Sequence, residues 1–279
     1  MSDPLSGQPF EIKSLADGLA LQGRYWAPAK PIAVMSLVHG LGEHSGRYTE
    51  LAEAMNSAGI AVVALDLRGH GNSAGKRGVC TEYKLLHEDL ETLLEKSRGL
   101  YPELPHFLYG HSLGGGLVLD YGRAPAPDIK GIIASAPFIA LPTPTPAIIG
   151  HIANLVRRIF PAATLGQPLT GDKISTLPEE QKIYETDPLN HSRISFGLAV
   201  DAIRAGERVA AHASQWNTPL LLMHAKGDQL TSCEASEAFA KAAQNVKFRS
   251  YENSEHEMHH DTPKAKVFGQ MIDFIESRA

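Results

Sequence analysis

Short uninterrupted runs of hydrophobic residues alternate along this chain with longer stretches of helical periodicity. The hydrophobic runs lie at 32–38, 60–66, 106–111, 129–135, 220–225 and 246–251. The helical stretches lie at 47–58, 81–98, 113–123, 196–212, 233–243 and 264–277. Continuous apolar runs are typical of parallel strands that are covered on both faces. The alternation therefore predicts an α/β fold, with a mostly parallel sheet and helices on both of its faces.

The alternation stops between residues 138 and 195. This segment opens with the Pro/Thr-rich stretch Leu141–Pro146, continues with a helical stretch at Ala147–Phe160, and contains no run typical of a strand. Such a break indicates an insertion between two strands of the sheet. We therefore expect a core formed by residues 1–137 and 196–279, with a helical cap inserted at 138–195.

The predicted cap helix has an unusually wide apolar face. Ile148, Ile152, Leu155 and Ile159 recur at helical spacing, and Ile149, Val156 and Phe160 widen the stripe. One interpretation is that the helix buries this face against the sheet. The other is that one part lines an acyl-binding tunnel while another part makes transient contact with a membrane surface. The helix is too short to span a bilayer but could lie in the interface.

Composition and charge narrow the possible partners and locations. The 279 residues carry a formal net charge of −5 without a Lys/Arg block, so we expect no nucleic-acid partner. Two cysteines, Cys80 and Cys233, cannot build a disulfide framework or a four-cysteine zinc site, and free thiols suit a reducing compartment. The segment Met1–Pro4 lacks the features of a signal peptide. We expect a cytoplasmic protein, peripheral to membranes at most, with no cofactor.

A candidate nucleophile lies between a predicted strand and a predicted helix. Residues 110–114 read Gly-His-Ser-Leu-Gly and match G-x-S-x-G. A sharp strand-to-helix turn exposes the serine Oγ above the sheet, and side chains larger than glycine two residues away would collide. The positive end of the helix dipole also lies where negative charge would develop. These features predict Ser112 as a nucleophile rather than as part of a turn that only packs tightly.

A serine nucleophile needs a base and an acid that orients the base. Asp228 follows the strand at 220–225 and His256 follows the strand at 246–251, so both are expected at the edge where parallel strands end. Their order in the chain, Ser then Asp then His, is the order that G-x-S-x-G hydrolases use. The rival acids Asp187 and Asp201 follow no predicted strand. The rival bases His259 and His260 lie further from the strand end.

Two backbone N–H groups are candidates for an oxyanion hole. Leu113 comes directly after Ser112, and Leu41 lies in the loop that follows the strand at 32–38. In this arrangement one donor comes from the residue after the nucleophile and the other from the loop after an early strand. We therefore predict Leu41 and Leu113 as the oxyanion donors.

Residues 256–260 also match a motif of a different class. The segment reads H-E-x-x-H, which binds zinc when both histidines lie on one face of a helix. Here Asn253 and Ser254 predict a turn directly before the motif, and Pro263 disfavours helix at the residue before it. We therefore expect no metal at this site.

Three motifs resemble those of monoacylglycerol lipases, in the lysophospholipase and serine-aminopeptidase-like branch of the α/β hydrolases. They are H-G-x-G-E-H-S-G-R-Y at 39–48, D-x-R-G-H-G-x-S at 66–73 and G-H-S-x-G-G at 110–115. The likeness extends over nearly the whole chain, to Tyr184-x-x-Asp187-Pro188, Gly227-Asp228 and His256.

The resemblance implies an α/β-hydrolase fold with a lid, and release of fatty acid and glycerol from a small lipid ester through an acyl-enzyme. It also implies that Glu43, Arg47, Tyr184 and His259 line the pocket for the polar head group. From the residues alone, Glu43 and Arg47 could instead form a surface ion pair, and Tyr184 could only pack the cap. A lysophospholipase, a general carboxylesterase, an aminopeptidase and a non-catalytic binding module are the alternatives. The intact Ser, Asp and His set argues against a non-catalytic module.

Overall fold

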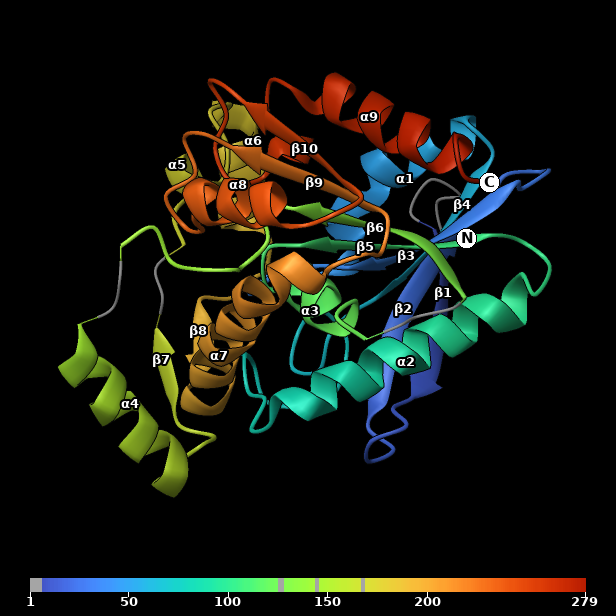
Figure 1. The fold of residues 1–279 in the computed structure, drawn as a ribbon. Coiled ribbons are helices and arrows are strands. Elements are labelled where there is room, and N and C mark those ends of the chain that lie inside the picture. Colours follow the sequence, from blue (N-terminus) through green and yellow to red (C-terminus); the bar gives the residue numbers. More distant parts are fainter. Residues whose placement is uncertain (1–6, 125–127, 144–145, 167–168) are drawn as a thin grey trace.

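An eight-stranded sheet forms the centre of the molecule, in the order β1-β2-β4-β3-β5-β6-β9-β10 (Figure 1). Its strands are β1 (Gln8–Lys13), β2 (Ala20–Trp26), β3 (Ala33–Val38), β4 (Ile60–Leu65), β5 (His106–His111), β6 (Ile129–Ser135), β9 (Leu220–Ala225) and β10 (Val246–Tyr251). From β4 to β10 every neighbouring pair is parallel, whereas β2 pairs antiparallel with both β1 and β4. The prediction of a mostly parallel sheet is confirmed.

The computed structural model describes residues 7–124, 128–143, 146–166 and 169–279. The expectation for the segment Met1–Pro4 and part of the Pro/Thr-rich stretch, Pro144 and Thr145, therefore lie outside the described residues. Within the described ranges the sequence analysis missed β1 and β2. Both strands are only partly buried at one edge of the sheet, so they lack the continuous apolar runs that mark the central strands.

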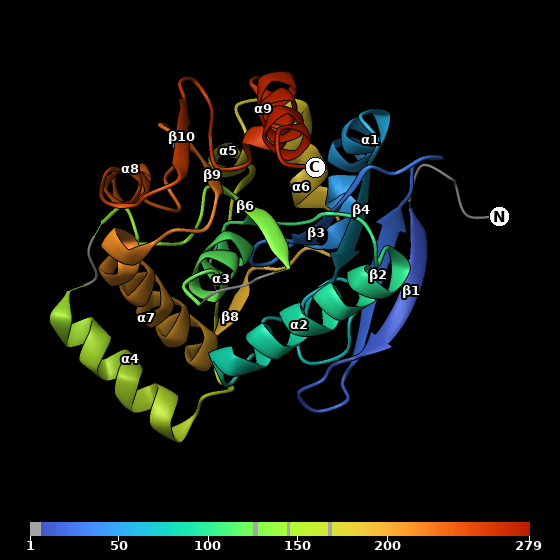
Figure 2. The same cartoon turned by 45° about the vertical axis from the view of Figure 1, so that its right-hand side comes forward.

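Helices cover both faces of the sheet (Figures 1 and 2). On one face lie α1 (Thr49–Ser57) and α9 (Lys264–Glu276). On the other lie α2 (Tyr83–Leu100), α3 (Leu113–Tyr121), α7 (Phe196–His212) and α8 (Cys233–Ala242). Each central strand therefore contributes side chains alternately to two hydrophobic cores: in β4, Val63 belongs to the core on the side of α2 and α3, and Val62 to the core on the side of α1 and α9. This double burial explains why the central strands are continuously apolar.

The chain between β6 and α7 leaves the sheet. It forms α4 (Ala147–Ile159), β7 (Thr164–Gly166), α5 (Gly171–Ile174), α6 (Pro178–Thr186) and β8 (Arg193–Ser195), and β7 pairs antiparallel with β8. The expectation that this segment holds no strand is wrong, because strands of three residues are too short to give a recognisable pattern. The division of the chain at 138 and 195 remains our proposal.

Helix α4 lies at the periphery of the molecule, beyond α7 (Figures 1 and 2). Arg157 on its inner side pairs with Asp201 of α7 at 2.7 Å. Its apolar stripe faces outward instead of toward the sheet, with Ile148 68%, Ile152 56% and Leu155 59% exposed. The interpretation that this face is buried against the sheet is therefore wrong. No helix in the described ranges combines the length and hydrophobicity needed to cross a membrane.

Two helical glycines provide a matched test of the packing between α7 and the start of the cap. A Cβ at Gly206 of α7 would lie 2.1 Å from the carbonyl oxygen of Ile139, whereas a Cβ at Gly269 of α9 would meet no atom within 4 Å. We predict that Gly206→Ala lowers the free energy of unfolding by about 1–3 kcal/mol. Gly269→Ala should raise it by up to about 1 kcal/mol, because alanine favours helix. Urea denaturation of both variants checks this, and equal shifts would contradict the packing described.

Candidate active site

Ser112 occupies the sharp turn between β5 and α3. Its backbone has φ 53° and ψ −116°, a conformation that costs energy for any residue other than glycine. Hydrogen bonds hold the turn in this conformation. The N–H of Ser112 donates to the Ser135 carbonyl at 3.0 Å, and its own carbonyl accepts from the N–H groups of Gly116 and Phe138, each at 2.9 Å. The strained turn directs the serine away from the sheet, as the motif predicts.

The two glycines of the motif allow three elements to approach one another closely. A Cβ at Gly110 would lie 2.3 Å from the carbonyl oxygen of Gly114. A Cβ at Gly114 would lie 2.4 Å from the carbonyl oxygen of Val38, at the end of β3. Real Cβ atoms do not tolerate such contacts, so glycine at both positions is a steric requirement of the turn.

Asp228 and His256 meet at the carboxyl ends of β9 and β10. The Nδ1 atom of His256 lies 2.7 Å from Oδ2 of Asp228, and both side chains are buried. The Asp228 carboxylate also accepts hydrogen bonds from the N–H groups of Leu230 at 2.8 Å and Thr231 at 3.0 Å, and from Thr231 Oγ1 at 2.8 Å. The aspartate is therefore fixed in place by its own loop.

A further histidine, His224, supports the same carboxylate and was missed by the sequence analysis. Its Nε2 atom lies 3.1 Å from Oδ2 of Asp228, and its Nδ1 atom lies 2.8 Å from Oγ of Ser236. The available signal was its position: His224 is a titratable residue inside the apolar run of β9, four residues before the aspartate. A buried polar residue in a central strand needs partners, and here the partner is Asp228.

The pKa values of both members of the pair are shifted. Burial opposes ionisation of Asp228, but the charge of His256 and hydrogen bonds from His224 and His256 outweigh it and hold the pKa of the carboxyl well below its usual range. Burial also opposes charging of His256, but the Asp228 carboxylate outweighs it and raises the pKa of the imidazole above its ordinary value of 6.5. The carboxylate is thus ionised at neutral pH and stabilises a protonated His256.

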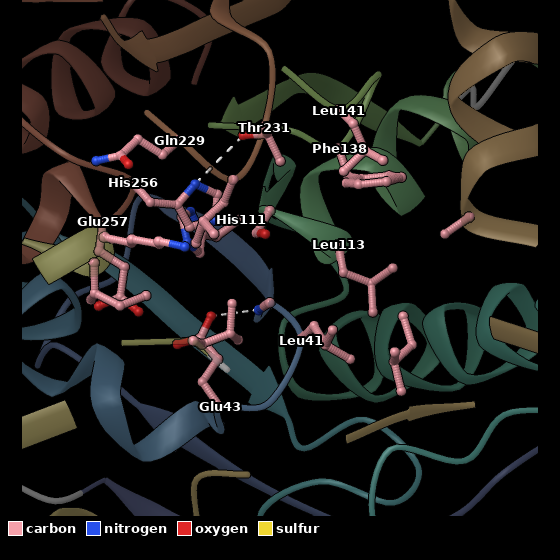
Figure 3. Close-up of a pocket in the computed structure, with 18 of the residues that line it drawn as sticks. Leu41, Glu43, His111, Leu113, Phe138, Leu141, Gln229, Thr231, His256 and Glu257 are labelled. Carbon is pink, nitrogen blue, oxygen red and sulfur yellow. Dashed lines mark hydrogen bonds between the residues drawn. The ribbon is translucent and has the colours of Figure 1, made fainter. Parts of the chain in front are cut away.

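Ser112 and His256 line a common cavity of about 360 Å³ beneath the cap. Figure 3 shows His256 and His111 on one wall, and Leu41 and Leu113 on another. The apolar lining consists of Leu41, Leu113, Phe138, Leu141, Leu169, Ile174, Ile194, Ala199, Ala202, Ile203 and Leu230. The polar lining includes Glu43, Lys173, Tyr184, Gln229, Thr231 and Glu257. The cavity therefore has apolar walls and a cluster of polar groups beside the serine.

The two predicted oxyanion donors lie at this cavity. No residue in the described part of the chain accepts a hydrogen bond from the N–H of Leu41 or Leu113. The neighbouring N–H groups are occupied: Gly40 N donates to Glu43 Oε1 at 2.5 Å, and Ser112 N donates to Ser135. Two free backbone donors at a buried pocket can donate hydrogen bonds to a bound carbonyl oxygen and stabilise the negative charge that develops on it.

The four residues predicted to bind the head group form part of a buried charge cluster. Arg47 lies between two carboxylates, 3.4 Å from Glu43 and in direct contact with Glu257, and its guanidinium stacks 4.9 Å from the Tyr184 ring centre. Glu43 and Tyr184 line the cavity, whereas Arg47 and His259 are not among its lining residues. His259 is fully buried and stacks on Tyr48, with ring centres 4.9 Å apart.

The two carboxylates of this cluster differ in proton affinity. Burial and the charge of Glu257 raise the pKa of Glu43 to about 7, although Arg47 opposes this. Burial opposes ionisation of Glu257 as well, but Arg47 and His260 outweigh it and keep its pKa well below the usual range. One arginine cannot compensate two buried carboxylates equally. Arg47 lies closer to Glu257 than to Glu43, so Glu257 is the carboxylate that stays ionised. The sequence analysis considered Glu257 only as part of the H-E-x-x-H motif and did not predict it in this site.

The structure also shows the partners of the rival residues. Asp187 pairs with His44 at 2.9 Å, and Asp201 pairs with Arg157, so neither acid contacts His256. In the H-E-x-x-H segment, Met258–His260 forms only one 3₁₀ turn. His260 Nδ1 lies 2.7 Å from Glu257 and its Nε2 lies 2.8 Å from the Arg47 carbonyl. Both nitrogens of His260 are therefore engaged with protein groups.

Two groups of side chains among the described residues have the composition of a metal site, and both include Glu257. Potential ligand atoms lie within 4.8 Å of one another in Glu257, His259 and His260, and likewise in Glu43, His111 and Glu257. However, the Arg47 guanidinium already binds the Glu257 carboxylate, and a metal ion beside this buried cation would be repelled. The arrangement does not fit the zinc site that the motif describes.

The fold and the site together define the class of the protein. A mostly parallel sheet carries a strained serine turn, a buried Asp–His pair and two free N–H donors at one pocket, and this is an α/β hydrolase. Residues 29–263 match the family described as serine aminopeptidase, S33, and the chain belongs to this family. It is therefore a serine hydrolase.

Individual relatives agree with this assignment. The chain is 30% identical over 256 residues to the monoacylglycerol lipase of Mycolicibacterium smegmatis, which covers 90% of this chain and 91% of that protein. It is similar to the solved structure of the Paleococcus ferrophilus monoacylglycerol lipase, with a TM-score of 0.83, 31% identity and coverage of 92% and 99%. It is also 26% identical over 247 residues to the phospholipase YtpA of Bacillus subtilis, with coverage of 87% and 95%.

Proposed function

We propose that this enzyme is a monoacylglycerol lipase that releases fatty acid and glycerol. The observation that carries the proposal is the cavity in which Ser112 and His256 face apolar walls together with a few polar groups, with Asp228 bound to His256 behind that wall. Such a cavity suits a substrate with one long apolar chain and a small polar head. The similarity to two monoacylglycerol lipases over most of the chain supports the same substrate class.

The proposed reaction begins with acylation of Ser112. His256 Nε2 accepts the proton of the Ser112 hydroxyl while Oγ attacks the ester carbonyl, and Asp228 orients the imidazole and stabilises its protonated form. The N–H groups of Leu41 and Leu113 bind the oxyanion that develops. Protonated His256 then gives its proton to the glycerol oxygen as the ester bond breaks, and glycerol leaves.

Deacylation repeats these steps with water. His256 takes a proton from a water molecule, the resulting hydroxide attacks the acyl carbonyl, and the proton returns to Ser112 Oγ as the fatty acid leaves. Through both halves the acyl chain lies against the apolar lining. Each methylene group that it removes from water contributes about 0.8 kcal/mol to binding. Glu43 and Tyr184 would contact the glycerol hydroxyls. Arg47 and His259 would support that end of the pocket without lining it.

A substrate panel tests the proposed substrate class. We predict that the purified enzyme has a higher kcat/KM for monoacylglycerol than for the matched diacylglycerol or lysophosphatidylcholine. The reason is that a cavity of about 360 Å³ holds one acyl chain and a small head group but not a second chain. Measuring fatty acid release from each substrate decides the class. A clear preference for lysophosphatidylcholine would replace the proposal with a lysophospholipase.

The same panel requires a control for the nucleophile. Ser112→Ala should lower kcat several thousandfold or more on every substrate, because only the oxyanion donors and substrate binding remain. Circular dichroism should show an unchanged fold. Hydrolysis by Ser112→Ala at near the wild-type rate would exclude Ser112 as nucleophile whatever the substrate preference.

The pH dependence of the reaction tests the role of the Asp228–His256 pair. His256 acts as a base only when neutral, and Asp228 raises its pKa above 6.5, so kcat/KM should rise with pH through this raised value. In Asp228→Asn the carboxylate is lost and burial lowers the pKa of His256 against only the charges of Glu257 and Glu43, so the acid limb should move to lower pH while kcat falls by about 10⁴. Wild-type and variant pH–rate profiles on one p-nitrophenyl ester measure both effects. An acid limb that stays in place would contradict this role.

We further propose that the enzyme works in the cytoplasm and reaches its lipid substrate at membrane surfaces through α4. The free thiols Cys80 and Cys233 are consistent with a reducing compartment. The exposed large hydrophobic side chains on and next to α4 are Ile148, Ile149, Ile152, Leu155, Ile159 and Phe160, each more than half exposed. A contiguous apolar stripe on an exposed helix suits the interface of a bilayer.

Vesicle binding tests this contact. We predict that replacing Ile152 and Leu155 together by aspartate weakens co-sedimentation with phosphatidylcholine vesicles at least about tenfold, because charged groups at two central positions of the stripe must be desolvated on docking. Hydrolysis of a short, soluble p-nitrophenyl ester should remain near the wild-type rate. The matched control is Ile32→Asp, which changes an exposed isoleucine directly before β3. Equal vesicle binding by all three proteins would contradict the proposed contact.

A further inference from the structure

Glu43 makes its shortest hydrogen bond with the loop that carries Leu41, and this contact is buried. The carboxylate atom Oε1 accepts from Gly40 N at 2.5 Å (Figure 3). It also accepts from the Tyr48 hydroxyl at 2.8 Å. Only 2% of the residue is exposed. Oε1 is thus committed to the loop, while Oε2 accepts no hydrogen bond from the described residues and lies 3.4 Å from Arg47 Nε.

The second polar group of Gly40 is also fixed, by His39. The Leu67 N–H donates to His39 Nε2 at 2.9 Å, so Nε2 is an acceptor and the proton of the neutral ring is on Nδ1. His39 Nδ1 therefore donates to the Gly40 carbonyl oxygen at 2.7 Å. The ring is neutral because burial lowers its pKa to about 4, despite the charge of Asp66.

These two bonds determine where the Leu41 N–H points. The peptide between Gly40 and Leu41 is planar and trans, so the Leu41 N–H is directed away from the Gly40 carbonyl that His39 holds. On the other side, Gly40 packs between Glu43 and the nucleophile: a Cβ there would lie 2.8 Å from Glu43 Oε1 and 3.0 Å from Ser112 Cβ. The loop cannot shift or rotate without breaking a bond or colliding with Ser112.

We propose that Glu43 and His39 are positioning residues for the oxyanion hole: by holding the N–H and the carbonyl of Gly40, they direct the Leu41 N–H toward the ester carbonyl. This inference rests on the proposed hydrolytic function. It differs from recognition of the head group, because it applies equally to esters that carry no head-group hydroxyl.

The test compares a monoacylglycerol with the methyl ester of the same fatty acid, which has no free hydroxyl. Glu43→Ala should lower kcat on both substrates by about 10²–10³, the effect of losing one oxyanion donor, and leave KM of the methyl ester within about threefold. Glu43→Gln keeps an oxygen acceptor for Gly40 N and should retain kcat within about tenfold. Tyr48→Phe removes only the other donor to Oε1 and serves as the matched control, with kcat near that of the wild type.

The outcomes separate this inference from its alternatives. If Glu43→Ala slows hydrolysis of monoacylglycerol but not of the methyl ester, Glu43 only recognises the head group and the inference is overturned. If the wild type cleaves neither ester, the proposed function itself fails. If the wild type cleaves both and Glu43→Ala does so equally well, only the positioning role fails.

A second pair of variants keeps the test decisive if Glu43→Ala does not fold. In His39→Asn the side-chain amide lies near the position of Nδ1 and can still donate to the Gly40 carbonyl. In His39→Gln the amide lies near the position of Nε2 and keeps only the contact with Leu67. We expect His39→Gln to have a kcat at least about tenfold below that of His39→Asn on the methyl ester. Equal values for the two variants would overturn the role of His39.

Discussion

Parallel strand pairing is the constraint on which the site depends. Because β3, β5, β9 and β10 run in one direction, their carboxyl ends lie at one edge of the sheet. The loops that follow these strands carry Leu41, Ser112, Asp228 and His256. Parallel pairing alone therefore brings together residues that lie more than 200 positions apart in the sequence. The helices on both faces stabilise this pairing, since each central strand is buried on both sides.

Buried charge is concentrated at the same edge. Asp228 accepts hydrogen bonds from its own loop, His224 and His256, while Arg47 bridges Glu43 and Glu257. Desolvating such groups is unfavourable, and the attraction between them offsets this only when the geometry is good. The result is a set of dipoles and charges that are already oriented before a substrate binds, which is what transition-state stabilisation in a dry pocket requires.

The cap combines two different surfaces. Its segment around α5 contacts the loop that carries His256: Ile174 accepts a hydrogen bond from Glu257 N at 2.8 Å, and Thr176 binds Asp261. Helix α4, by contrast, contacts α7 through Arg157 and exposes its apolar stripe. The part of the cap nearest Ser112 is thus fixed to the edge of the sheet that carries the candidate site, and α4 carries the exposed apolar surface.

The central strands, the helices of the core, α4 and the positions of Ser112, Asp228 and His256 after strand ends could be predicted from the sequence, because these depend on local periodicity and on the steric demands of one turn. The cap helices α5 and α6 were not predicted, since their segment reads as a loop. The sequence also did not reveal β1, β2, β7 or β8, whose patterns are short or half-exposed. Three features became visible in the folded chain alone: the stripe of α4 faces outward, Arg47 pairs with Glu257 as well as with Glu43, and His224 supports Asp228. These features depend on which distant side chains become neighbours, and the spacing of residues along one chain does not contain that information.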